Sequence, residues 1–103
     1  MSRIDTLRSF VASSPRDPFP RYALALEFRE AGRLDERWDS IDVLLREMYD
    51  YVPAYLHAGQ LLLTIGRKDE ARDVFRRGIA TATRVGDGHA RAELEGALAA
   101  LGA

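Results

Sequence analysis

Residues 55–79 read YLHAGQLLLTIGRKDEARDVFRRGI, two amphipathic stretches that meet at Gly66. Gly32 lies 34 residues earlier in the same surroundings, because each glycine closes an apolar stretch and is followed by Arg and then by an Asp-Glu pair. A fixed period of this size is typical of a solenoid built from helix pairs. The sequence therefore predicts a helical repeat, an architecture that more often binds other molecules than catalyses reactions.

The same 34-residue shift aligns the apolar positions of the two copies. Leu24, Ala25 and Phe28 fall on Ala58, Gly59 and Leu62, and Ile41 and Leu45 fall on Phe75 and Ile79. Spacings of three and four residues mark one face of a helix. Each copy therefore predicts two helices that pack their apolar faces together.

Turn and capping residues divide the chain into six predicted helices, and no strand pattern is present. Asp17 is a suitable N-cap before Pro18, and Gly32 and Gly66 supply the left-handed conformation that ends a helix. Asp35 and Asp69 are expected to cap the helices that follow these glycines. The predicted helices are one ending at 13–15 and five over 18–31, 35–49, 53–65, 69–82 and 90–101.

Composition limits the class of protein. The 103 residues contain no cysteine, which excludes a disulfide framework and a thiolate metal site. A net charge of −1 argues against a general nucleic-acid or anionic-membrane binder. The N-terminus lacks the apolar core of a signal peptide, and charges interrupt every apolar run before a membrane-spanning length. We therefore expect a soluble, cytoplasmic protein without a membrane partner.

Charge is distributed unevenly between the two copies. Residues 18–51 carry a net charge of −3, from five Arg and eight acidic residues, and residues 52–85 carry +3, from six basic and three acidic residues. A solvated surface with many ion pairs would explain this pattern. A complementary surface for docking or self-association would explain it as well.

The second copy resembles a tetratricopeptide repeat. The family's first-helix pattern falls on Tyr55, Ala58, Gly59 and Leu62, its turn glycine on Gly66, and its second-helix signature on Ala71, Phe75 and Gly78. The first copy keeps Leu24, Ala25, Phe28, Gly32 and Leu44. It departs from the family at Arg21 in the aromatic position, Arg37 in the small-residue position and Ile41 in the phenylalanine position.

The resemblance implies an all-α, right-handed solenoid of helix hairpins in a small, bacterial-type tetratricopeptide repeat protein. A single domain over 1–103 would contain two repeats, 18–51 and 52–85, flanked by half-repeat capping helices at 1–17 and 86–103. Ile4, Leu7 and Phe10 would cover one end, and Leu94, Leu98 and Leu101 the other.

Two glycines and one arginine test this register. Gly59 and Gly78 lie inside predicted helices, where glycine costs about 1 kcal/mol relative to alanine. They are expected where two helix backbones approach closely. Arg37 occupies a position that the family gives to a small residue, so either its side chain extends outward along its stem or its helices cross farther apart.

In the family, the first helix of each repeat lines a concave groove that holds the ligand. The resemblance assigns this peptide-binding groove to Phe19, Tyr22, Leu26, Arg29, Leu56, Gln60 and Leu63. Tyr22 and Leu26 could instead be core residues beneath the N-terminal helix. The carboxylate clamp of chaperone-binding members is absent, because its positions hold Tyr22, Leu26, Leu56 and Gln60.

The sequence shows no constellation typical of an enzyme, and we expect no catalytic residues, cofactor or metal. His89 and Glu93 are four residues apart and could share a metal with His57, but exposed surface histidines explain them better. Arg72, Arg76 and Arg77 could contact RNA, although Asp69, Glu70 and Asp73 interrupt the basic patch.

The predicted function is noncatalytic binding of a protein or peptide in the groove. An alternative is a structural homo-oligomer, such as a homodimer, that uses the groove or the charge-segregated faces for self-association. A third is weak RNA binding through the arginines of the outer face, which the balanced charge disfavours.

Overall fold

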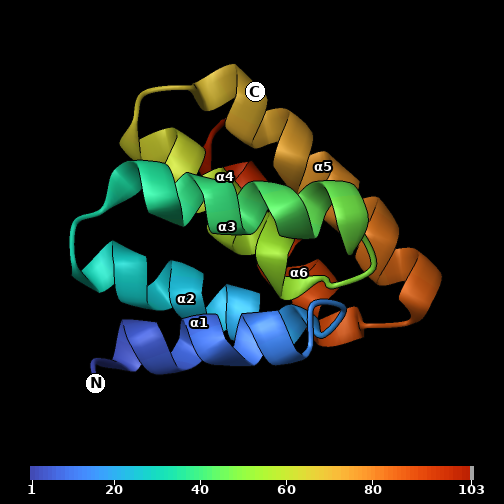
Figure 1. The fold of residues 1–103 in the computed structure, drawn as a ribbon. Helices are drawn as coiled ribbons and strands as arrows, with labels where there is room; N and C mark the ends of the chain where they lie inside the picture. The colour runs from blue at the N-terminus through green and yellow to red at the C-terminus, as the bar shows by residue number, and fades with distance from the viewer. Residues whose placement is uncertain (103) are drawn as a thin grey trace. The chain divides into compact units, whose positions relative to one another are not determined.

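The computed structural model describes residues 1–102, which form six α-helices and no strand (Figure 1). The helices are α1 (Arg3–Ser13), α2 (Pro18–Glu30), α3 (Leu34–Glu47), α4 (Pro53–Thr64), α5 (Lys68–Val85) and α6 (Gly88–Ala100). The predicted all-α class with six helices is confirmed. In this described part of the chain, no helix combines the length and the apolarity needed to cross a bilayer.

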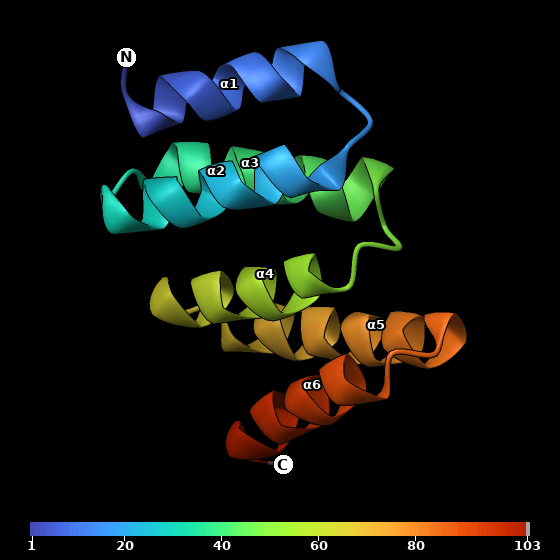
Figure 2. The ribbon, with the colours of Figure 1, turned by 90° about the horizontal axis from the view of Figure 1, so that it is seen from below.

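The helices form two compact units, Met1–Met48 and Tyr49–Ala103, here called unit 1 and unit 2. In unit 1, α2 packs along α3, and α1 packs on α2 (Figure 2). In unit 2, α4 packs along α5, and α6 packs mainly on α5 and also touches α4. The assignment of a single domain to 1–103, with segments 1–17, 18–51, 52–85 and 86–103, stays a prediction.

Glycine ends α2 in the way the sequence predicts. Gly32 has a φ of 69°. Its N–H donates to the carbonyl of Arg29 at 3.2 Å, and the N–H of Arg33 donates to the carbonyl of Phe28 at 2.9 Å. These two bonds define a Schellman motif, which needs a left-handed residue. The same pair of bonds closes α4 at Gly66 and α5 at Gly86.

The predicted N-caps are correct at α2 and wrong at α3 and α5. Asp17 accepts a hydrogen bond from the N–H of Phe19 at 3.0 Å. In contrast, α3 begins one residue before Asp35 and α5 one residue before Asp69, and their caps, Arg33 and Arg67, make no capping bond through a side chain.

The reason lies in the tight turn between paired helices. Arg33 donates its N–H to the end of α2, and its carbonyl accepts the N–H of Arg37 at 3.0 Å in α3. One residue therefore closes one helix and opens the next, which leaves no place for a separate cap. Asp35 lies instead in the first turn, where a carboxylate offsets the positive end of the helix dipole. α3 also stops at Glu47 and does not reach Tyr49, the predicted end.

The cores are made by the faces that the period predicts. In unit 1 they include Leu24, Ala25, Phe28, Ile41, Leu44 and Leu45, and in unit 2 Tyr55, Ala58, Leu61, Leu62, Ala71, Val74, Phe75, Ala82 and Leu94. A Cβ on Gly59 would lie within 2.6 Å of three atoms of the Phe75 ring, and one on Gly78 would lie 2.6 Å from Tyr55 Cβ. Close packing at both glycines is confirmed, but the nearest atoms belong to side chains, of Phe75 at Gly59 and of Tyr55 and Leu94 at Gly78, and not to the backbone of a neighbouring helix as predicted.

The two terminal helices pack unequally. In α6, Leu94 is buried and Leu98 is half-buried, as expected for a covering helix. α1 has no buried residue, and Phe10, which was expected to cover the end, is 55% exposed. Ile4, Leu7 and Val11 form the half-buried face of α1, and Phe10 projects beside that face.

Both arginines that depart from the family pattern lie in unit 1. Arg37 is only 8% exposed, so its side chain does not extend outward into water. Burial, and then the nearby charge of Arg29, lowers the pKa of the Arg37 guanidinium. Arg21 is half-buried, and its Nη2 donates to the carbonyl of Pro15 at 3.4 Å, while its Nε is buried without a hydrogen-bond partner.

Candidate protein-binding surface

The four groove residues predicted on α2 share one side of that helix, with spacings of three, four and three residues. Phe19 is 63% exposed, Arg29 is exposed, and Tyr22 and Leu26 are half-buried. Asp17 and Pro18 fix the start of α2, which places Phe19 in its first turn. The opposite side, with Leu24 and Phe28, is buried in unit 1. α2 thus has a core side and an accessible, largely apolar side.

α4 repeats this arrangement within unit 2. Leu56, Gln60 and Leu63 share one side, and Gln60 and Leu63 are exposed while Leu56 is half-buried. The other side of α4 is buried and includes Tyr55 and Leu62. α4 contains no Asp, Glu, Lys or Arg, so its accessible side offers apolar and amide contacts without a charge. We call these accessible sides of α2 and α4 the α2 face and the α4 face.

Two polar contacts fix the beginning of α4. The hydroxyl of Tyr55 donates to the carbonyl of Tyr49 at 2.6 Å, and Arg84 Nη2 pairs with Asp50 Oδ1 at 2.6 Å. The hydrogen bond and the charge of Asp50 raise the pKa of Arg84, so the guanidinium stays charged. The segment before α4 is thereby tied to α4 and to the last turn of α5.

The arginines of α5 do not form a free basic patch. Arg72 pairs with Asp69 at 2.9 Å, and Arg76 lies 3.9 Å from Asp73. Arg77 lies over the Tyr55 ring, 5.7 Å from its centroid. Two of the acidic residues that interrupt the patch in the sequence, Asp69 and Asp73, thus pair with two of its three arginines, which weakens the case for an RNA contact.

The histidines differ from expectation in one respect. His89 is exposed, and its Nε2 lies 3.0 Å from Glu93 Oε1 in the next turn. His57 is 2% exposed, so the expectation of a surface histidine is wrong there. His57 directly follows Leu56 in α4, and a rotation of 100° per residue turns it away from the α4 face. Among residues 1–102, no three metal-binding side chains gather at one place.

One cluster in unit 1 has no counterpart in the sequence-based predictions. Glu36 accepts hydrogen bonds from Arg33, three residues away, and from Arg8, 28 residues away. The pair with Arg33 could be inferred from the helix start. No periodicity relates Arg8 to Glu36, so their contact follows only from the packing of α1.

The architecture described above is that of an all-α helical repeat protein, and comparison with solved structures gives the family. A tetratricopeptide repeat domain protein from Salinibacter ruber is 32% identical in its solution NMR structure, with a TM-score of 0.82 and coverage of 86% of this chain and 90% of that chain. A crystal structure of such a protein from the same organism gives 32% identity, a TM-score of 0.79 and coverages of 84% and 96%. The chain belongs to the tetratricopeptide repeat family.

A third solved structure, of a protein from Bordetella parapertussis, is similar in fold. Its TM-score is 0.80 at 23% identity, over 98% of this chain and 88% of that chain. No protein-family model matches the sequence, and no curated protein is significantly similar to it. The tetratricopeptide repeat fold is generally that of a protein–protein interaction module, and such repeats are typically noncatalytic scaffolds.

Proposed function

We propose that this protein binds a protein or peptide segment, without catalysis, through the α2 face and the α4 face. The observation that carries the proposal is the same in both helices: one side is buried in the core, and the other leaves large apolar side chains accessible. Phe19, 63% exposed in the first turn of α2, is the clearest case. A few anchor residues, with aromatic side chains prominent among them, supply most of the binding energy in protein interfaces.

Binding to a partner recovered from the source cell by affinity capture tests this proposal. The purified partner is titrated against the parent and against Phe19→Ala and Leu63→Ala, which remove one anchor from each face. Tyr49→Ala is the matched control, because Tyr49 is also a large exposed side chain but lies outside both faces. We expect each face variant to lose more than about 1 kcal/mol of binding free energy and the control to lose none.

Helical circular dichroism and melting temperature establish that each variant remains folded. Unchanged affinity in both face variants, combined with a loss on changing Arg72, Arg76 and Arg77, would move the site to α5 and contradict the proposal. A loss in only one face variant would restrict the site to that face.

Self-association is the second candidate, and the charges of two helices favour it. α3 carries five acidic residues and two arginines, whereas α5 carries five basic and three acidic residues. Asp35 and Asp39 in α3 are exposed and form no ion pair among residues 1–102. A homodimer joined by these charges would dissociate as the salt concentration rises. Sedimentation of the chain at roughly 0.05 M and roughly 0.5 M NaCl tests this candidate, which predicts a dimer at the lower salt concentration and a monomer at the higher one.

The proposal includes a cytoplasmic location, with which a sequence without cysteine is compatible. The partner is a protein or peptide, and neither a nucleic acid nor a membrane is part of the proposal. Fractionation of the source cell, followed by detection of the chain with an antibody, tests the location.

A further inference from the structure

The way α1 is attached to unit 1 differs from the way every other helix is attached. α1 has no buried residue, whereas each of the other five helices has at least one. Its apolar contact with α2 is made by the half-buried side chains of Ile4, Leu7 and Val11. The departure of α1 would therefore expose no fully buried side chain of that helix itself, whereas the departure of any other helix would expose at least one.

Polar contacts of arginine provide the rest of the attachment. Arg3 Nε pairs with Glu27 of α2 at 2.8 Å, and Arg8 Nη2 pairs with Glu36 of α3 at 2.7 Å. The Arg8 guanidinium also lies over the ring of Phe28, 5.6 Å from its centroid. Both ion pairs are accessible to water, so each contributes little and is screened by salt.

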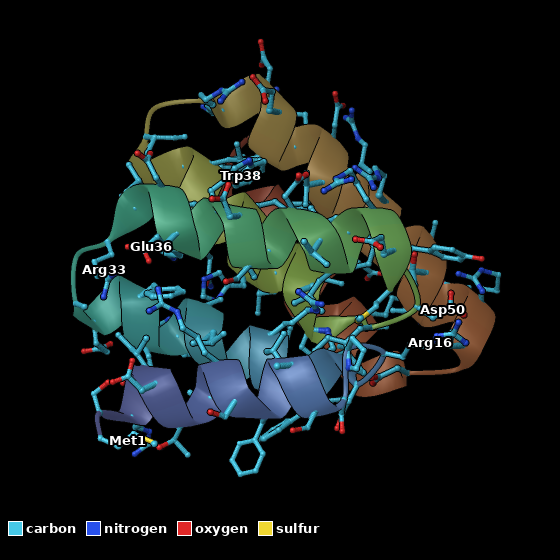
Figure 3. All side chains as sticks on the ribbon, viewed as in Figure 1. Met1, Arg16, Arg33, Glu36, Trp38 and Asp50 are labelled. Atoms are coloured by element: carbon cyan, nitrogen blue, oxygen red, sulfur yellow. The ribbon has the colours of Figure 1, made fainter. Side chains whose placement is uncertain are left out.

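A second arginine, Arg33, contacts the same two partners as Arg8. Figure 3 shows Arg33 and Glu36 side by side at the turn between α2 and α3. Arg33 Nε and Nη2 donate to the Glu36 carboxylate at 2.5 and 2.8 Å, and the Arg33 guanidinium lies 5.2 Å from the Phe28 centroid. If Arg8 leaves, Glu36 keeps a bidentate cation and Phe28 keeps a cation over its ring. The departure of α1 thus leaves no charge without a partner at this point.

The helices on both sides of the connection are closed by their own residues. Ser2 and Asp5 form a reciprocal capping box at the start of α1, and the N–H of Ser14 bonds to the carbonyl of Phe10 at its end. Asp17 caps α2 from within the connecting segment. Neither helix requires the other to satisfy its terminal backbone groups.

We propose that α1 opens from and closes on α2 while α2 and α3 stay folded, with Arg8 as the latch on the carboxylate that Arg33 already holds. Opening exposes the surface of α2 next to Phe28, and rising salt concentration favours the open form. α1 is then a movable cover of α2, not a fixed part of the core.

Hydrogen exchange of the full chain tests this proposal. The readout is the ratio of the exchange rate of α1 amides to that of α2 amides, after correction for the intrinsic rates. In the parent we expect this ratio to be at least about ten and to rise with NaCl concentration, because α1 opens locally and α2 does not.

Two variants with opposite expected effects examine the latch. Arg8→Gln removes the ion pair and the cation–ring contact and should raise the ratio about three- to tenfold. Arg33→Gln should lower the ratio. Without Arg33, the departure of Arg8 would leave the Glu36 carboxylate unpaired, so opening of α1 would cost more. Arg46→Gln is the matched control, because its pair with Asp42 is similarly exposed, 62%/37% against 50%/36% for Arg8–Glu36, and lies within α3. It should leave the ratio unchanged.

The results that would overturn the proposal are equally specific. A ratio near one in the parent would mean that α1 and α2 exchange in one unfolding event. An Arg8→Gln variant with an unchanged ratio would remove Arg8 from the role of latch. A higher ratio in Arg33→Gln would show that Arg33 holds α1 closed and does not replace Arg8.

Discussion

Phe75 and Gly59 stabilise unit 2 together, because the Phe75 ring fills the space that a side chain at position 59 would occupy. The Phe75 ring is fully buried and lies against Gly59, where a Cβ would overlap it. The glycine is unfavourable for helix formation in α4, but it allows Phe75, the largest fully buried side chain of unit 2, to pack. The two residues therefore act as one contact, and each has a consequence that can be measured.

Replacing Phe75 with Ala should lower the free energy of unfolding by about 3–5 kcal/mol, because it removes a fully buried ring and leaves a cavity. Urea unfolding followed by circular dichroism measures this change. A loss below about 1 kcal/mol would contradict the central place of Phe75 in the core.

Replacing Gly59 with Ala should lower the free energy of unfolding by about 1–3 kcal/mol, because the new methyl group meets the Phe75 ring. Gly96→Ala in α6 is the control, since a Cβ there meets no atom within 4 Å. That control should raise stability by about 0.5–1 kcal/mol through helix propensity alone. Equal effects of the two changes in thermal melts would show that close packing at Gly59 is unimportant.

At Arg21, in contrast, a substitution should raise the free energy of unfolding. Its buried Nε lacks a hydrogen-bond partner, and its position is one that the family gives to an aromatic residue. Arg21→Met keeps a long side chain but removes the unsatisfied donor, so we expect a gain of about 1 kcal/mol in unfolding free energy. Arg16→Met, in the exposed connection, should change stability by less than about 0.5 kcal/mol. A loss of stability in Arg21→Met would mean that its bond to Pro15 outweighs the unsatisfied nitrogen.

The helices show which features the sequence can predict. The 34-residue period, the amphipathic spacing and the turn glycines together predict six helices and the buried faces of α2 to α5, because these are local signals. The caps at Asp35 and Asp69 were wrong, because each turn uses one arginine to end a helix and begin the next. The exposure of Phe10 and the contact between Arg8 and Glu36 depend on how α1 packs on α2, which no local pattern contains.

The candidate site likewise has features that the sequence predicts and one that it does not. The spacing along α2 and α4 predicts which residues share a side of each helix, and the structure places Phe19, Gln60 and Leu63 in accessible positions. The burial of His57 could not be inferred from the sequence, since histidine occurs on surfaces and in cores alike. Whether these sides bind a ligand stays a prediction.

α6 should be required for a soluble unit 2, in contrast to the loosely attached α1. Leu94 of α6 is buried, and its side chain lies 3.0 Å from the place of a Cβ on Gly78. Removing residues 88–103 should expose the apolar side of α5 and cause aggregation. Light scattering at increasing protein concentration measures this effect. A truncated chain that stays monomeric and melts cooperatively would show that α6 is dispensable.

For the whole molecule, family membership and function rest on different evidence. The fold and the 32% identity to a tetratricopeptide repeat domain protein establish the family. The binding function is a proposal supported by the accessible apolar sides of α2 and α4, one in each unit. A direct view of the bound ligand's position on the chain would therefore test the account more strictly than affinity alone.

The most direct measurement is a chemical-shift map of the ¹⁵N-labelled full chain, recorded by NMR while the captured partner is added. The account predicts that the largest shift changes fall on the α2 face and the α4 face, around Phe19, Tyr22, Leu56 and Leu63, with small changes along α5. Changes concentrated on Arg72, Arg76 and Arg77, with the α2 and α4 faces unaffected, would contradict it.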